Sequence, residues 1–161
     1  MLRLLFKLTA LLILASSLHA GAPAAPQAES PAPLLRILNS DPSETKRLDA
    51  LAQLERTRSV DAQQIARSIC DTSPAIRAAI VRIGAGLALN DPELQLRLIA
   101  LSNDRSPLVQ AQMLKTLPTF PSARASDSLR KLLIAAARSE DPDLRSLAES
   151  LNKAQQTAIT R

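Results

Sequence analysis

Apolar residues recur at every third or fourth position along most of the chain, a spacing that places them on one face of an α-helix. Residues 74–89 show the pattern best, with Ile76, Ile80 and Ile83 on one face. Alternation with a period of two is weak, and Val, Thr and aromatic residues, which favour strands, are few. The pattern therefore predicts an all-α fold.

The predicted helices are punctuated by prolines that return at a nearly constant interval. Pro42, Pro74, Pro107 and Pro142 are separated by 32, 33 and 35 residues. A period of about 20 to 50 residues is typical of solenoids, in which helix pairs too small to fold alone stack into one core. We therefore expect a helical-repeat domain over 34–161, a short α-solenoid of about four antiparallel helix pairs. The predicted pairs are 34–39 with 43–57, which is the least regular, 61–71 with 74–89, 92–102 with 107–117, and 123–138 with 142–156.

The residue before each of these prolines predicts how the helix begins. Ser and Asp favour the position before a helix because their side-chain oxygen accepts a hydrogen bond from the first turn. Proline suits the next position, since its missing N–H would have no partner there. Asp41 and Glu44 also have the spacing of a capping box. Such helix starts are expected at Asp41, Ser73, Asp91, Ser106 and Asp141.

The first 33 residues differ in composition from the rest of the chain. Arg3 and Lys7 precede a short apolar run, and small residues follow up to Ala20, an order typical of a secretory signal peptide over 1–20. We expect cleavage after Ala20, a periplasmic or secreted location in a bacterium and no stable membrane insertion afterwards; an uncleaved N-terminal anchor is the alternative. Residues 21–33 are rich in Pro and Ala and are expected to form a disordered tether.

The composition of the mature chain argues against an enzyme. Cleavage would remove Arg3, Lys7 and His19, which leaves no His and 18 of the 20 Lys and Arg against 15 Asp and Glu, a formal charge of +3 instead of +5. His is the commonest catalytic base, so we expect no enzymatic activity, and we expect no cofactor. Export and the lack of aromatic residues for base stacking also argue against nucleic acid as a partner.

Three local features are expected to be structural. Cys70 is the single thiol and is expected to be a small buried apolar residue, with an intermolecular disulfide as the alternative. The acidic residues within 140–143 lack the spacing of a calcium loop and are expected to stabilise a helix start, not to bind a metal. The glycines of the segment 84–86 are expected to let two helices approach closely or to end one of them.

The segments 71–77 (DTSPAIR) and 141–145 (DPDLR) resemble the start of the second helix in the HEAT-repeat family. The resemblance covers roughly residues 60–156, and the segment beginning at Asp104 departs from it by placing Gln110 where Arg is usual. It implies a ladder of Asp and Arg side chains between neighbouring repeats. The residues that would form this ladder here are Asp71, Arg77, Asp104, Asp141 and Arg145.

The function expected from these features is that of a non-enzymatic, exported scaffold whose concave, second-helix surface binds a protein partner, with an acidic protein as one candidate. Arg77, Gln110 and Arg145 each follow a helix-opening proline by three residues and are expected to form one row, with Arg82 and Lys115 as a second row. The segment from 106 to 151 is also similar to HEAT segments attached to exported c-type cytochromes and quinoprotein dehydrogenases. The alternative is therefore an accessory subunit of a periplasmic redox or transport complex, without a haem motif or cofactor of its own.

Overall fold

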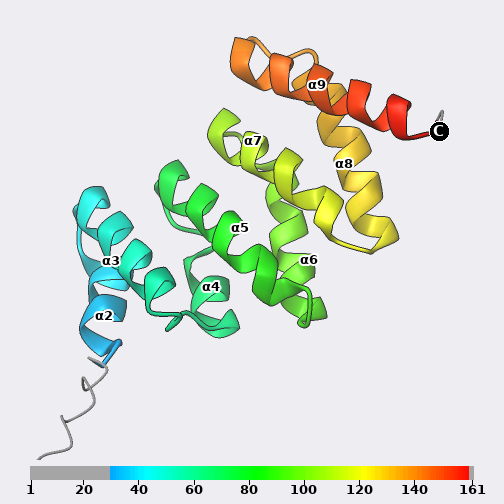
Figure 1. The fold of residues 1–161 in the computed structure, drawn as a ribbon. Coiled ribbons are helices and arrows are strands. Elements are labelled where there is room, and N and C mark those ends of the chain that lie inside the picture. Colours follow the sequence, from blue (N-terminus) through cyan, green and yellow to red (C-terminus); the bar gives the residue numbers. More distant parts are fainter. Residues whose placement is uncertain (1–29, 160–161) are drawn as a thin grey trace, which may run out of the picture. The chain divides into compact units, whose positions relative to one another are not determined.

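The structure, a computed structural model, describes residues 30–159 of the chain. The expected signal peptide and residues 21–29 of the expected tether lie outside this range. Within it, all regular structure is helical, which confirms the all-α prediction, and each α-helix overlaps a segment in which one was expected (Figure 1). The elements are α2 (Ala32–Ser40), α3 (Glu44–Arg56), α4 (Ala62–Ser68), α5 (Pro74–Ala88), α6 (Pro92–Ala100), η1 (Leu101–Asn103), α7 (Pro107–Thr116), η2 (Leu117–Thr119), α8 (Ala123–Ala136) and α9 (Pro142–Ile159), where η marks a short 3₁₀ turn.

Most element boundaries differ from the expected ones by one to three residues, and two of these differences change the local picture. Helix α2 begins at Ala32, so the last two residues of the segment expected to be a tether lie in its first turn. Helix α4 ends at Ser68, three residues before the expected end at residue 71. The chain then turns directly into the start of α5, because Ser73 and Pro74 form the cap and first residue of that helix.

The predicted helix caps are confirmed at three of the five positions. The Ser73 hydroxyl accepts a hydrogen bond from the Ile76 amide at 3.3 Å. Carboxylate oxygens of Asp91 and Asp141 accept in the same way from the amides three residues on, at 3.0 and 2.9 Å. These bonds satisfy backbone donors that have no partner inside the helix.

The other two predictions are met only in part or not at all. Ser106 occupies the cap position before α7, as expected, but its hydroxyl makes no cap hydrogen bond. Asp41 does not cap α3, because that helix begins at Glu44 and Ser43 is its cap, with the hydroxyl 3.4 Å from the Lys46 amide. A capping box forms instead at α4, where the side chains of Asp61 and Gln64 each bond the other's backbone amide.

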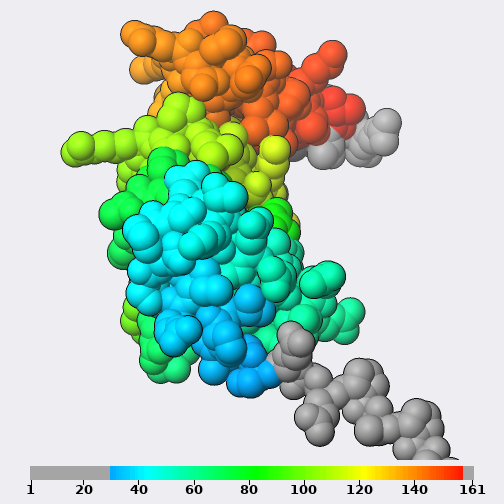
Figure 2. Space-filling view, turned by 90° about the vertical axis from the view of Figure 1, so that its left-hand side faces the viewer, coloured from blue at the N-terminus to red at the C-terminus, as the bar shows by residue number. Residues whose placement is uncertain are grey.

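The helices pack in a regular order of neighbours. Helix α3 contacts α5, α5 contacts α7 and α7 contacts α9, so that every second helix of the chain lies beside the next one (Figure 1). The helices between them follow the same order, since α4 contacts α6 and α6 contacts α8. Helices α2 and α3 form one end of the described part and lie in front in Figure 2. No helix within residues 30–159 is long and apolar enough to cross a membrane.

The core runs between these two sets of helices and is built from aliphatic side chains. Leu54, Ile65, Ile80, Leu98 and Leu114 are completely buried, and they come from α3, α4, α5, α6 and α7. Phe120 is the single aromatic residue of the buried set within the described residues. Small and medium-sized side chains let helices approach closely, which is the packing expected from a composition with almost no aromatics.

Gly84 lies at a close approach between helices. A methyl group at this position would lie 2.8 Å from Cγ2 of Ile65 and 3.2 Å from Cδ1 of Leu98, on the neighbouring helices α4 and α6. The expectation that the glycine segment permits close packing is therefore confirmed at Gly84. Gly86 faces open space, and α5 continues past both glycines to Ala88.

Candidate binding surface

The same hydrogen bond recurs at the start of four helices. At each start, a side-chain nitrogen donates to the backbone carbonyl oxygen of the residue six positions earlier. The four bonds are Arg47 Nη1 to Asp41 at 2.9 Å, Arg77 Nη1 to Asp71 at 2.8 Å, Gln110 Nε2 to Asp104 at 2.7 Å, and Arg145 Nη1 to Ser139 at 2.5 Å. Arg77, Gln110 and Arg145 are thus equivalent, as the sequence predicts, but each is engaged with the turn before its own helix.

The side chain six positions earlier closes the same turn from the other side. Asp41, Asp71 and Asp104 each accept a hydrogen bond from the amide two residues on, at 2.9, 2.7 and 2.8 Å. In the last turn Ser139 plays this part, because its hydroxyl accepts from the Asp141 amide at 3.2 Å. Asp or Ser followed two residues later by Ser or Asp is therefore the sequence mark of each turn.

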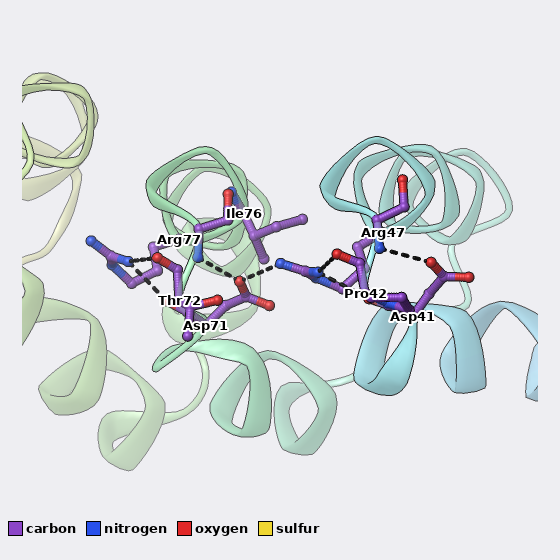
Figure 3. Close-up of polar contacts among 9 residues, drawn as sticks. Asp41, Pro42, Arg47, Asp71, Thr72, Ile76 and Arg77 are labelled. Atoms are coloured by element: carbon purple, nitrogen blue, oxygen red, sulfur yellow. Dashed lines mark hydrogen bonds and ion pairs between the residues drawn. The ribbon is translucent and has the colours of Figure 1, made fainter.

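Neighbouring turns are also joined to each other by partly buried ion pairs. Arg47 Nη2 lies 3.0 Å from Oδ1 of Asp71, as Figure 3 shows. Arg77 bonds Asp104 with two nitrogens, Nε to Oδ2 at 2.7 Å and Nη2 to Oδ1 at 2.9 Å. The side chains of Arg77 and Asp104 are only 16% and 8% exposed. Each cation thus joins its own turn to the carboxylate of the next turn along the chain.

The Arg77–Asp104 pair shifts both pKa values in the direction that keeps the charges. Hydrogen bonding to Arg77 holds the pKa of the Asp104 carboxyl below its usual value, against the opposing effect of burial. The Asp104 carboxylate likewise raises the pKa of Arg77. The pair therefore remains ionised, and it acts as a fixed link between the α5 and α7 turns.

The register of these turns differs from the expected one at both ends of the described chain. Alignment on prolines overlooked Arg47, which matches Arg77 only when Asp41 is aligned with Asp71. It also paired Asp141 with Asp71, whereas the position equivalent to Asp71 is Ser139. Asp141 caps α9 and does not take part in the expected ladder of Asp and Arg side chains. In both 41–47 and 71–77, an Asp-x-Ser turn is followed by Arg after three intervening residues. This shared spacing would have revealed the correct alignment.

The second expected row lies further along the same helices. Arg82 and Lys115 each follow their cap residue by nine positions, and Ala52 and Ser150 occupy this position in α3 and α9. Both nitrogens Nη1 and Nη2 of Arg82 bond the Glu55 carboxylate on α3, the second at 2.7 Å. The bond raises the pKa of Arg82 and lowers that of Glu55. The pair is half exposed, so it adds little to stability.

Lys115 is different because its side chain is exposed and forms no ion pair with any residue in 30–159. It lies at one end of a groove of about 340 Å³ between α7 and α9. The apolar part of the groove includes Leu108, which is 53% exposed although it is a large aliphatic residue. The remaining lining residues are Pro107, Ala111, Asp141, Asp143, Leu144 and Leu147.

Cys70 is exposed, so the expectation of a buried thiol is wrong. The cause is the early end of α4 at Ser68, which leaves Cys70 in the turn before α5 and not on the apolar face of a helix. No group of three or more His, Cys, Asp or Glu within residues 30–159 is arranged to hold a metal ion.

Within the described residues, paired charges hold the turns, and the charge of Lys115, which has no ion-pair partner, borders a partly apolar groove. Comparison of the chain with family models, with curated proteins and with solved structures finds no match in any of the three.

Proposed function

We propose that residues 31–159 form a HEAT-like solenoid whose second-helix surface binds a protein partner. The repeated turn supports the solenoid, because the same side-chain bond occurs at intervals of 30, 33 and 35 residues, from Arg47 to Arg77, Gln110 and Arg145. The order of contacts among α3, α5, α7 and α9 supports it as well, since each helix lies beside the equivalent helix of the next pair. Stacked repeats of this kind commonly use an extended surface to bind partners.

The observation that carries the binding proposal is the exposure of Leu108 beside the unpaired cation of Lys115. Leu108 is a large aliphatic side chain and is more than half exposed. A partner that covers such a side chain stabilises the complex by about 25 cal/mol for each Å² of apolar surface removed from water. Charged groups at the rim of such a patch chiefly set the partner's identity and its rate of association. We call the residues Leu108, Ala111, Lys115 and Leu147 the α7/α9 surface.

The charged and apolar residues that line the groove between α7 and α9 define the chemistry of the partner. Lys115 lies about 12 Å along the axis of α7 from Pro107, given a rise of 1.5 Å per residue. Asp143, the second residue of α9, also lines this groove. The partner therefore presents an acidic group to Lys115 and an apolar side chain to Leu108.

The rows expected from the sequence contribute unequally to this function. Arg77, Gln110 and Arg145 are occupied by the turns and serve as scaffold. Arg82 is neutralised by Glu55, so its replacement by an acid would place two carboxylates together and disturb the protein itself. Lys115 is therefore the residue of the second row whose replacement tests partner binding.

In this proposal the protein binds its partner without catalysing a reaction, and it does so after export to the periplasm or out of the cell.

The test is quantitative capture of partners from a bacterial cell envelope with the mature protein as bait. We compare the wild-type protein with Lys115→Glu and Leu108→Ala, and with the matched control Lys153→Glu, which makes the same charge change at an exposed residue of α9 that does not line the groove. We expect a specific protein whose recovery falls about tenfold with Lys115→Glu and with Leu108→Ala, and does not change with Lys153→Glu. Equal recovery with all four proteins would refute the α7/α9 surface as the binding site. Circular dichroism of each variant checks that the fold is retained.

A further inference from the structure

A second and larger groove lies between α6 and α8, outside the α7/α9 surface. Its volume is about 610 Å³, within the range of sites that bind small molecules or peptide side chains. Helix α6 supplies Leu96, Ile99 and Ala100, and α8 supplies Leu132 and Ala135 as further apolar lining. None of the residues that line it belongs to the α7/α9 surface.

One stripe of α8 gives this groove its charge. Arg124, Ser128 and Lys131 line it at positions i, i+4 and i+7 of the helix, which places them on one face. A rise of 1.5 Å per residue separates the backbone positions of Arg124 and Lys131 by about 10 Å along the axis. The Ser128 hydroxyl lies between the two cations in sequence and can donate or accept a hydrogen bond.

Neither cation of the stripe is neutralised within residues 30–159. Arg124 and Lys131 form no ion pair with any described residue. Asp127 also lines the groove, but its carboxylate pairs with Arg130 at 3.2 Å. The α8 wall of the groove therefore carries two unpaired positive charges beside one carboxylate that already has a partner.

The α6 wall of the groove is apolar. Leu96 of α6 lines the groove and is 45% exposed, although it is a large aliphatic residue. Asn103 and Gln110 add amide groups from η1 and α7. A ligand that fits the groove must present anions to α8 and an apolar group to α6.

We propose that the groove between α6 and α8 binds an acidic amphipathic helix of a partner protein, with two carboxylates on one face and an apolar side chain between them. In a helix, residues i and i+7 lie on one face about 10 Å apart, which matches the spacing of Arg124 and Lys131. A residue at i+4 lies between them on the same face and would contact Leu96. Binding places one carboxylate at each cation, and the charges on the rim give the interaction its selectivity.

This site is independent of the α7/α9 surface, and either can fail without the other. The probe is a synthetic alanine-based peptide of about 20 residues with Glu at positions i and i+7 and Leu at i+4, carrying a fluorophore. Its binding to the mature protein is followed by fluorescence anisotropy at low salt. The comparison peptide has Lys in place of both Glu. The variants are Arg124→Gln/Lys131→Gln, Leu96→Ala, and the control Arg138→Gln, which removes an exposed cation just after α8 that neither lines the groove nor pairs with a residue that does.

We expect the acidic peptide to bind with a Kd in the micromolar range, and the double variant to raise this Kd at least tenfold. Leu96→Ala is expected to raise it about threefold to tenfold, and Arg138→Gln to leave it within twofold. The basic peptide is expected not to bind. Absence of binding by the acidic peptide, or equal Kd values for the wild-type protein and the double variant, would overturn the proposal. Displacement of the peptide by a free aliphatic dicarboxylate at equal concentration would also overturn it, because the site would then recognise small dianions.

Discussion

The link between Arg77 and Asp104 makes the most specific prediction about how the helix pairs are held together. We consider the replacement Asp104→Asn, which removes one negative charge and changes the shape of the side chain very little. The asparagine oxygen can still accept from the Ser106 amide and from Arg77 Nη2, as Oδ1 does now. The amide nitrogen that replaces Oδ2 cannot accept the bond that Arg77 Nε donates at 2.7 Å.

The magnitude follows from the burial of this pair. A hydrogen bond to a charged group contributes about 1.5 to 3 kcal/mol, and Asp104 is only 8% exposed, so solvent replaces little of the loss. We therefore expect Asp104→Asn to lower the free energy of unfolding by about 2 kcal/mol. For a domain of this size, that change corresponds to a decrease in Tm of about 8 °C.

Urea unfolding followed by circular dichroism measures this quantity, and Asp127→Asn is the matched control. Asp127 also pairs with an arginine, but its side chain is 65% exposed, so the expected loss is below about 0.5 kcal/mol. The double variant Arg77→Gln/Asp104→Asn should lose about 1 to 2 kcal/mol less than the sum of the single variants, because the two residues interact directly. A loss for Asp104→Asn no larger than that for Asp127→Asn would refute the structural role of the link.

Three further predictions concern the same packing and turns. Gly84→Ala should be about 2 kcal/mol less stable than Gly86→Ala in thermal unfolding, because a methyl group at 84 meets side chains of α4 and α6 at 2.8 and 3.2 Å whereas one at 86 meets none; equal stabilities would contradict this packing. The folded-state pKa of Asp104 lies below its ordinary value of 3.8, so its contribution to stability is complete above that pH and is lost as the pH falls through the lower folded-state value. In acid titrations, the stability difference between the wild-type protein and Asp104→Asn should therefore shrink below about pH 4, and a difference that grows there would oppose the assignment. Ser73→Ala should cost about 1 kcal/mol and Ser106→Ala less than about 0.5 kcal/mol in urea unfolding, because only the first hydroxyl caps its helix; the reverse order would show the caps to be wrongly placed.

The sequence predicts the helices well because their starts depend on local chemistry. Prolines at 74, 92, 107 and 142 each occupy the first residue of a helix, where the missing N–H has no cost. The same rule fails at Pro42, because Ser43 supplies the cap one residue later. A proline thus indicates a nearby helix start, and the competing cap residue decides its position.

Contacts between distant segments were predicted less well. Arg47 meets Asp71 across 24 residues, and only the alignment of whole turns could have paired them. The exposure of Cys70 follows from the early end of α4, which the apolar periodicity around Ile65 and Ile69 does not mark. The exposure of Leu108 depends on how α9 packs beside α7, so the sequence pattern of α7 does not reveal it.

We infer that each helix pair is stable only against its neighbours. The pair α4 and α5 illustrates this dependence, because Gly84 of α5 packs against Leu98 of α6, outside the pair, and isolated helices of this length are marginal in water. The direct measurement is far-ultraviolet circular dichroism of a peptide spanning residues 61–90, compared with the mature protein under the same conditions. We expect little helix and no cooperative thermal transition in the peptide, and both in the protein. A peptide that is helical and unfolds cooperatively would contradict the account.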